Sequence, residues 1–243
     1  MGQALVVRHP KGSSVNWIKC LRDLPGVLIR DVPRYAAALA KSGGDNHGNL
    51  DGWISLCNRT ERLNRVEGAK GLECDWVWGS SLHAAGVLPS LGRGLMRVAL
   101  REWPIQFADQ PTSAHDPDIS FIIAHRGEER LPQLMRTLQS LFAQEEVCCE
   151  YIVVDQSDLP LIGRLPAGVT YLHLPKDGVP PGWYKSWALN TGARIARSNV
   201  LVFHDGDICA PVEYGRELAR IFKSERYAAA SLQRLLFYLS TAD

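Results

Sequence analysis

The second half of the chain alternates short apolar runs with segments of helical spacing, and this alternation limits the folds open to it. The runs ISFIIA (119–124), YIVVD (151–155), VTYLHL (169–174) and VLVFH (200–204) have the length and apolar content of buried strands. Over 131–142, between the first two runs, apolar side chains recur at helical spacing. Strands that alternate with helices need right-handed crossovers. The sequence therefore predicts an α/β fold with a mainly parallel sheet and helices on both faces.

Two more helices and a linker complete the predicted organisation. Residues 184–197 and 211–224 have helical spacing, and Pro211 is predicted to stand in the first turn of the second helix. The polar, proline-containing stretch ADQPTSAHDPD separates this pattern from the preceding residues, in which strands and helices do not alternate regularly. We therefore expect two parts: residues 1–115, of unassigned fold and unknown role, and an α/β domain over 116–243.

The overall composition excludes some classes of function. With 27 Lys and Arg against 26 Asp and Glu, the 243-residue chain has a net charge of +1, which argues against nucleic acid as a partner. The six cysteines lack the paired spacing of a zinc site or a disulfide framework, which favours a reducing compartment. No stretch is long and apolar enough to predict a transmembrane segment. We expect a cytoplasmic location, with peripheral attachment to a membrane left open.

Polar residues follow the ends of the predicted strands. Ligands of such sheets bind beyond the carboxyl ends of the strands, so these residues are candidates for a binding site. Arg126 and Glu128 come after the first strand, and Asp155 and Asp205 directly end the second and fourth. A carboxylate at the rim of a buried sheet is costly unless something pairs with it. The alternative is that these aspartates only form turns and caps, for which the residue is well suited.

The fourth strand leads into Asp205-Gly206-Asp207, which places two carboxylates around a glycine. Such hard oxygen ligands suit Mg²⁺ or Mn²⁺, which usually takes one or two protein carboxylates and completes its shell with water and phosphate oxygens. The same spacing recurs in Asp116-Pro117-Asp118, but before the first strand, at the amino end, where no ligand site is expected. We predict a metal site at Asp205 and Asp207, and a plain linker at 116–118.

Aromatic residues gather at the start of the predicted helix 184–197. Trp183, Tyr184 and Trp187 could form a platform on which a sugar stacks, because aromatic faces suit the C–H surfaces of a pyranose ring. Core packing of an amphipathic helix explains the same residues equally well. The sequence leaves both readings open.

Three segments together resemble the nucleotide-binding half of a family 2 glycosyltransferase with a GT-A fold. These are ISFIIAHRGEERLPQLMRTLQSL, EYIVVDQSD and WALNTGARIARSNVLVFHDGD. They occur in the order of that family, and the resemblance extends over about 118–243, roughly half of the chain. It implies a Rossmann-like GT-A domain in which Arg126 and Glu128 lie beside the nucleotide. It also implies that Asp155 lies at the uracil or ribose side of the donor.

The same resemblance implies the reaction. Asp207 would be the main ligand of Mn²⁺ or Mg²⁺, Asp205 would lie near the ribose and the metal, and Asn190 would support their loop. The metal would stabilise charge on the leaving nucleoside diphosphate. A hydroxyl of an unknown saccharide, lipid or protein acceptor would attack the anomeric carbon with inversion, assisted by a carboxylate base. We therefore expect a metal-dependent glycosyltransferase of the hexosyltransferase type that uses a nucleotide-diphosphate sugar, with a UDP-sugar as the expected donor.

Two other functions stay open at this point. No cluster of carboxylates follows Asp207 apart from helix residues, so we expect the base outside this chain or in its N-terminal half, and a domain truncated at its C-terminus. A missing base also fits a non-catalytic module that binds nucleotide-sugars. A nucleotidyltransferase would share a similar sheet and acidic metal site. Its first strand should be followed by a glycine-rich basic loop, whereas AHRGEER contains one glycine.

Overall fold

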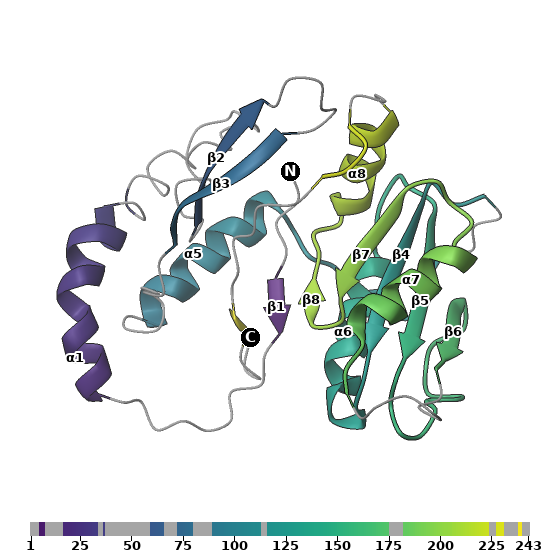
Figure 1. The fold of residues 1–243 in the computed structure, drawn as a ribbon. Helices are drawn as coiled ribbons and strands as arrows, with labels where there is room; N and C mark the ends of the chain where they lie inside the picture. The colour runs from purple at the N-terminus through teal and green to yellow at the C-terminus, as the bar shows by residue number, and fades with distance from the viewer. Residues whose placement is uncertain are drawn as a thin grey trace. The chain divides into compact units, whose positions relative to one another are not determined.

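A computed structural model describes residues 5–7, 17–33, 36, 59–65, 72–79, 89–112, 116–174, 182–223, 227–230 and 238–239. The chain divides into two compact units (Figure 1). One contains Met1–Arg8 and Ile105–Arg226, and the other contains His9–Pro104 and Tyr227–Asp243. The residues of each unit lie close together, which does not show that either unit folds independently. The expected domain boundary after residue 115 therefore stays a prediction.

The unit of His9–Pro104 and Tyr227–Asp243 contains two α-helices, a π-helical turn, a hairpin and a short strand among its described residues. These elements are α1 (Trp17–Gly26), η1 (Val27–Asp31), β2 (Arg59–Arg65), β3 (Leu72–Gly79), α5 (Pro89–Glu102) and β9 (Tyr238–Leu239). Strands β2 and β3 pair antiparallel, with a register shift between Thr60 and Glu61. The predictions about function concern the other unit.

A four-stranded parallel sheet forms the centre of the unit that contains Ile105–Arg226. Its strands are β4 (Ile119–His125), β5 (Cys149–Asp155), β6 (Val169–His173) and β7 (Leu201–Asp205). They lie in the order β6-β5-β4-β7, and all three pairings are parallel. A helix connects β4 to β5 and another connects β6 to β7, whereas residues 156–168 between β5 and β6 contain no helix. The predicted α/β fold with a mainly parallel sheet is confirmed.

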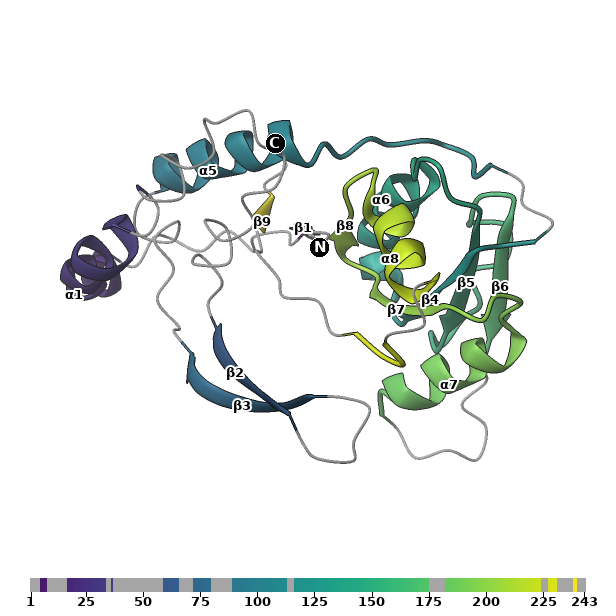
Figure 2. The same ribbon diagram turned by 90° about the horizontal axis from the view of Figure 1, so that it is seen from above.

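Helices cover both faces of this sheet (Figure 2). They are α6 (Leu131–Phe142), α7 (Lys185–Ile195) and α8 (Tyr214–Lys223). On one face, Ile122 packs in a buried cluster with Ala188 of α7. On the other face, the ring of Phe121 lies 6.0 Å from that of Tyr151 and 5.9 Å from that of Tyr214, between centroids. Because neighbouring strand residues point to opposite faces, the central strands β4 and β5, which are buried along almost their whole length, are apolar at most positions.

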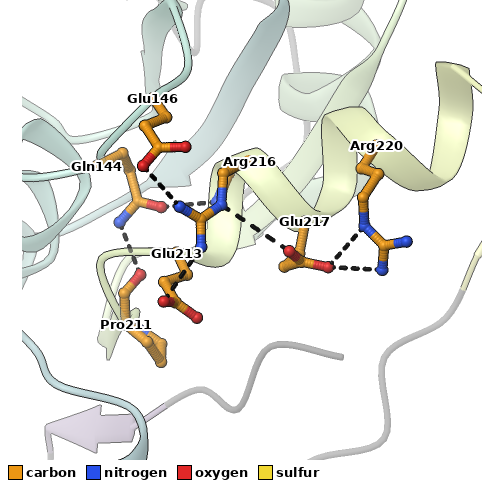
Figure 3. A network of polar contacts seen from close by, with 8 residues as sticks. Gln144, Glu146, Pro211, Glu213, Arg216, Glu217 and Arg220 are labelled. Carbon is orange, nitrogen blue, oxygen red and sulfur yellow. Dashed lines mark hydrogen bonds and ion pairs between the residues drawn. The ribbon is translucent and has the colours of Figure 1, made fainter. Parts of the chain in front are cut away.

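The end of α6 holds the segment that joins β7 to α8. Ser140 Oγ accepts a hydrogen bond from the backbone nitrogen of Ala210 at 3.2 Å. Gln144 Nε2 donates to the carbonyl of Pro211 at 2.9 Å, and Gln144 Oε1 accepts from the nitrogen of Gly215 at 2.7 Å (Figure 3). The side chain of Gln144, just after α6, is therefore bonded to the start of α8.

The prediction that Pro211 stands in the first turn of α8 is wrong. The helix begins at Tyr214, whose nitrogen donates to the carbonyl of Pro211 at 3.1 Å in a turn before the helix. The bond from Gln144 to the same carbonyl holds this turn in place. Sequence reasoning also missed β8 (Ile208–Cys209), which pairs antiparallel with β1 (Leu5–Val7).

Charged side chains add a second attachment of α8. Arg216 pairs with Glu146, which precedes β5, at 3.0 Å and with Glu213 at 3.1 Å (Figure 3). Glu217 is bonded by Arg220 one turn further along the helix, at 2.7 Å. Exposed pairs of this kind stabilise a fold only slightly, so the bonds of Gln144 carry more of the attachment.

Gly192 marks a close approach of α7 to the sheet. A Cβ atom at this position would lie 2.5 Å from Cγ2 of Ile122 and 3.2 Å from Cγ2 of Val154. We expect Gly192→Ala to lower the free energy of unfolding by about 1–3 kcal/mol, because overpacking forces the helix away from the strands. Urea unfolding followed by circular dichroism measures this change.

A matched control for that variant is Gly94→Ala in α5. The described part of the chain leaves open space around a Cβ atom built on Gly94. Alanine is the better helix former there, so we expect unchanged stability or a gain of up to about 1 kcal/mol. If Gly192→Ala unfolds at the same urea concentration as the parent, α7 does not depend on this close contact.

Glu150 of β5 forms hydrogen bonds with β4 and with the segment after α7, at the amino edge of the sheet. Its side chain is only 5% exposed. It accepts hydrogen bonds from Ser120 Oγ at 2.6 Å, from the nitrogen of Arg197 at 2.9 Å and from Arg197 Nε at 2.6 Å. Burial alone would raise the pKa of Glu150, but the bonds from Arg197 and Ser120 outweigh it and lower this pKa below its usual value.

We expect Glu150 to make stability depend on pH in the acidic range. Since its pKa is lower in the folded chain than in the unfolded chain, the unfolded chain binds the proton more readily. The stabilisation is therefore full above the unfolded pKa of about 4.3 and is lost as the pH falls through the lower folded value. Urea unfolding between about pH 3 and pH 7 should show a weaker pH dependence for Glu150→Gln. The exposed Glu145→Gln should behave like the parent, and an equal slope in all three proteins would contradict the prediction.

Candidate functional site

Two of the predicted site residues flank the end of the central strand β4. The register pairs His125 with Asp155 on one side and Ala124 with Asp205 on the other. Parallel strands share one carboxyl edge, which is where ligands of such sheets bind. The structure therefore brings Asp155 and Asp205 to the same edge as the loop that follows β4.

The loop Asp205-Gly206-Asp207 lies directly on this edge. Asp205 is the last residue of β7, and Asp207 follows in the turn before β8. Both aspartates are half-buried. A Cβ atom on Gly206 would lie 3.3 Å from Cγ2 of Ile123, so the loop runs close to the end of the sheet. Both aspartates of the loop thus lie at the predicted ligand-binding edge.

The alternation along β7 decides which side Asp205 faces. Val202 and His204 are buried, whereas Phe203 is exposed and pairs in register with Ile122, which packs against α7. Asp205 follows two positions later and so lies on the α7 side of the sheet. Its Oδ1 atom accepts a hydrogen bond from Nζ of Lys185, the first residue of α7. The two side chains also form an ion pair.

The second D-x-D sequence lies at the opposite edge. Asp118 directly precedes β4, at its amino end. Its carboxylate accepts a hydrogen bond from the nitrogen of Cys148 at 3.0 Å and pairs with Lys223 at 3.8 Å. Asp116-Pro117-Asp118 thus occupies the position expected for a linker and offers an internal comparison for the D-x-D loop.

Asp155 is fully buried, with 0% of its surface exposed. Its Oδ1 atom accepts hydrogen bonds from the nitrogen and Oγ of Ser157 at 2.9 and 2.6 Å, and its Oδ2 atom accepts from the hydroxyl of Tyr171 at 2.9 Å. The same hydroxyl accepts from the nitrogen of Leu161 at 2.7 Å. Asp155 therefore orders the loop between β5 and β6. Its expected contact with the base or ribose of a donor stays a prediction.

The loop after β4 carries two more predicted residues. Gly127 has φ +95°, a conformation that favours glycine, and its nitrogen donates to Ser157 Oγ at 2.9 Å. Arg126 is half-buried, whereas Glu128 is exposed and pairs with Arg164 of the β5–β6 connection at 2.6 Å. Both residues lie at the carboxyl edge of the sheet, and their expected contacts with a nucleotide stay predictions.

His125 is the last residue of β4 and directly precedes the loop that contains Arg126 and Glu128. It is buried, and within the described part of the chain its Nε2 atom has no hydrogen-bond partner. Burial lowers the pKa of His125 below its ordinary value, although the nearby Asp155 carboxylate acts in the opposite direction. The imidazole is therefore neutral near pH 7 and can accept or donate one hydrogen bond at Nε2.

Helix α7 presents polar and aromatic side chains outward. Asn190 is exposed on this helix, and its expected support of the D-x-D loop stays a prediction. Trp183 and Trp187 are also exposed, so the reading of these two as core residues is wrong. The fully buried residues of the helix are small, Ala188 and Gly192, and the partly buried Leu189 also packs against the cluster on the sheet.

Sequence reasoning missed Lys185 and Gln156. Gln156 follows β5 and is buried; its Oε1 atom accepts from the nitrogen of Tyr184 at 3.1 Å, and its Nε2 atom donates to the carbonyl of Tyr184 at 3.3 Å. Lys185, the next residue, contacts Asp205. The topology could have indicated Lys185. A crossover helix between parallel strands starts at the carboxyl edge of the sheet, so its first residue is a candidate for the site.

The residues of the D-x-D loop fit a hard divalent cation. Asp205 and Asp207 supply oxygen ligands only, and two carboxylates are what Mg²⁺ or Mn²⁺ usually takes from a protein. No group of three or more His, Cys, Asp or Glu side chains among the described residues could hold a metal by itself. The neighbouring His204 adds no ligand, because its ring packs between those of Phe121 and Tyr214, 5.9 and 5.8 Å away.

Comparison with known proteins agrees with this geometry. The model of the family described as glycosyl transferase family 2 matches residues 120–242, which include the parallel sheet from the second residue of β4 onward and the D-x-D loop. A search of curated proteins found no significant match. None of the helices in the described ranges is long and apolar enough to cross a membrane. Because the family match covers just over half of the 243 residues and the fold agrees with it, the chain belongs to glycosyl transferase family 2.

Proposed function

We propose that the chain transfers a hexose from a UDP-sugar to an acceptor hydroxyl, with inversion and with the help of Mn²⁺ or Mg²⁺. Membership of the family supports sugar transfer in general. The observation that carries the finer proposal is the position of Asp205, which ends β7 at the carboxyl edge of a parallel sheet, and of Asp207 in the turn that follows. The acceptor is a saccharide, a lipid or a protein.

Each residue of the edge has a proposed role in holding the donor. Asp207 and Asp205 would hold the metal, which when bound stabilises negative charge on the leaving diphosphate. Arg126 and Glu128 would contact the nucleotide: the guanidinium suits phosphate oxygens, and the carboxylate can accept hydrogen bonds from the ribose or base. Asp155 would accept hydrogen bonds from the uracil or ribose.

The remaining proposed contacts come from α7 and the residues before it. Asn190 would support the D-x-D loop. Trp183 and Trp187 expose aromatic faces that suit the C–H surfaces of a sugar ring. Their exposure favours the sugar-stacking role over core packing.

A non-catalytic module that binds nucleotide-sugars is the second candidate, and one observation favours it. Inverting transfer needs a carboxylate base near the acceptor hydroxyl. Of the described carboxylates that follow the D-x-D loop, Glu213 pairs with Arg216 and Glu217 with Arg220 along α8. Both carboxylates form ion pairs with arginines of α8, so we assign neither as the catalytic base.

Thermal unfolding with a panel of nucleotide-sugars tests the proposal. A ligand of the folded chain stabilises it by RT ln(1 + [L]/Kd), about 2.7 kcal/mol at a hundred times Kd. We expect UDP and UDP-sugars to raise the unfolding temperature in Mn²⁺ and to have little effect in EDTA. If no nucleotide-sugar shifts the transition under either condition, the donor proposal fails. Turnover of a radiolabelled UDP-sugar with mixed acceptors then separates an enzyme from a binding module.

A further inference from the structure

Lys185 places a positive charge on the D-x-D loop. Its ammonium group pairs with Oδ1 of Asp205, and its side chain is 46% exposed. The pair connects the first residue of α7 with the last residue of β7. The pair lies at the same edge of the sheet as Asp207, the second carboxylate of the D-x-D loop.

The main chain before Lys185 is held by hydrogen bonds with the residue that follows β5. The side-chain amide of the buried Gln156 makes two hydrogen bonds with the backbone of Tyr184: its oxygen accepts from the nitrogen of Tyr184, and its NH2 group donates to the carbonyl of Tyr184. The nitrogen of Gln156 in turn donates to the carbonyl of His125 at 2.9 Å. The start of the Lys185 side chain is therefore held, while its four-carbon stem leaves the ammonium group free to change partner.

From this geometry we propose that Lys185 is an exchangeable counter-ion of the D-x-D loop. Without donor it pairs with Asp205; with metal and donor bound it pairs with a phosphate oxygen of the nucleotide-sugar. This inference rests on the proposed function, because it needs a diphosphate donor at this edge.

The charges require such an exchange. Asp205 and Asp207 repel each other, and Lys185 offsets one of the two negative charges. The ammonium group cannot share Oδ1 of Asp205 with a divalent cation, because like charges repel at that distance. A diphosphate brings negative oxygens to the same place, and a lysine is a common partner for phosphate. Ion pairs exposed to this degree are weak, so the change of partner is easy.

Two binding measurements on the whole chain test the proposal with Lys185→Met, which keeps the stem and removes the charge. We expect Mn²⁺ alone to bind about two- to fivefold more tightly to this variant, measured by the electron paramagnetic resonance of free Mn²⁺, because a weak competing ion pair is gone. We expect UDP in saturating Mn²⁺ to bind at least about tenfold more weakly by calorimetry, because a charged hydrogen bond to phosphate is lost. A merely structural role would not move the two affinities in opposite directions.

Lys185→Arg and Lys223→Met are the matched variants. Arginine keeps the charge and should retain UDP affinity within a few-fold of the parent. Lys223 also pairs with an aspartate, Asp118, but at the amino edge of the sheet, so its loss should change neither affinity. Weaker Mn²⁺ binding, or unchanged UDP affinity, in folded Lys185→Met overturns the inference while the donor proposal stands. If the parent binds neither Mn²⁺ nor UDP, both proposals fail.

Discussion

Replacing Asp207 with Asn is expected to abolish the gain in UDP affinity that Mn²⁺ or Mg²⁺ provides. Asparagine keeps the size of the side chain but withdraws one of the two negative charges in the D-x-D loop. The D-x-D loop offers two carboxylates as proposed metal ligands, so the substitution removes half of their negative charge. We expect UDP affinity in Mn²⁺ to fall at least about tenfold, to the metal-free level, as the loss of one charged contact predicts. Calorimetry with Mn²⁺ and with EDTA measures the difference.

Asp118→Asn is the matched control for that variant. It belongs to a second D-x-D sequence with the same spacing, but it lies at the amino edge and bonds to the backbone of Cys148. We expect it to leave the metal dependence of UDP binding as in the parent. Asp207 is half-buried in a turn, so both variants should fold. Unaltered metal-dependent binding in Asp207→Asn would remove this residue from the metal site.

The central sheet was predictable because both of its faces are covered. A strand such as Ile119–His125, buried on each side, must be apolar at nearly every position, and this run is visible without any structure. The pattern of α6 was equally clear, since one face of the helix packs on the sheet. Strands β1 and β8 were missed because each is very short and their partners are about two hundred residues apart, so no local pattern records their pairing.

The place of the candidate site followed from topology, but its contacts did not. Parallel strands fix which ends meet, so Asp155 and Asp205 could be assigned to one edge from the order of the elements alone. The burial of Asp155 depends on Tyr171, which lies on the next strand, and on the loop that Gly127 turns. Such contacts between loops join residues whose spacing in the sequence has no periodicity. Geometry was needed to find them.

Asp155→Ala is expected to lower the free energy of unfolding by about 3–4 kcal/mol, because it breaks a buried hydrogen-bond network and leaves the partners of a charged group unsatisfied. The carboxylate has 0% exposure and accepts three hydrogen bonds within the fold. Urea unfolding measures this loss. UDP binding, measured at a temperature where the variant is folded, should weaken by a further 1–3 kcal/mol, or about 5- to 150-fold, if Asp155 also holds the donor. Asp155→Asn retains one acceptor and serves where the alanine variant does not fold. A loss of stability with unchanged UDP affinity would show that Asp155 only orders the loop between β5 and β6.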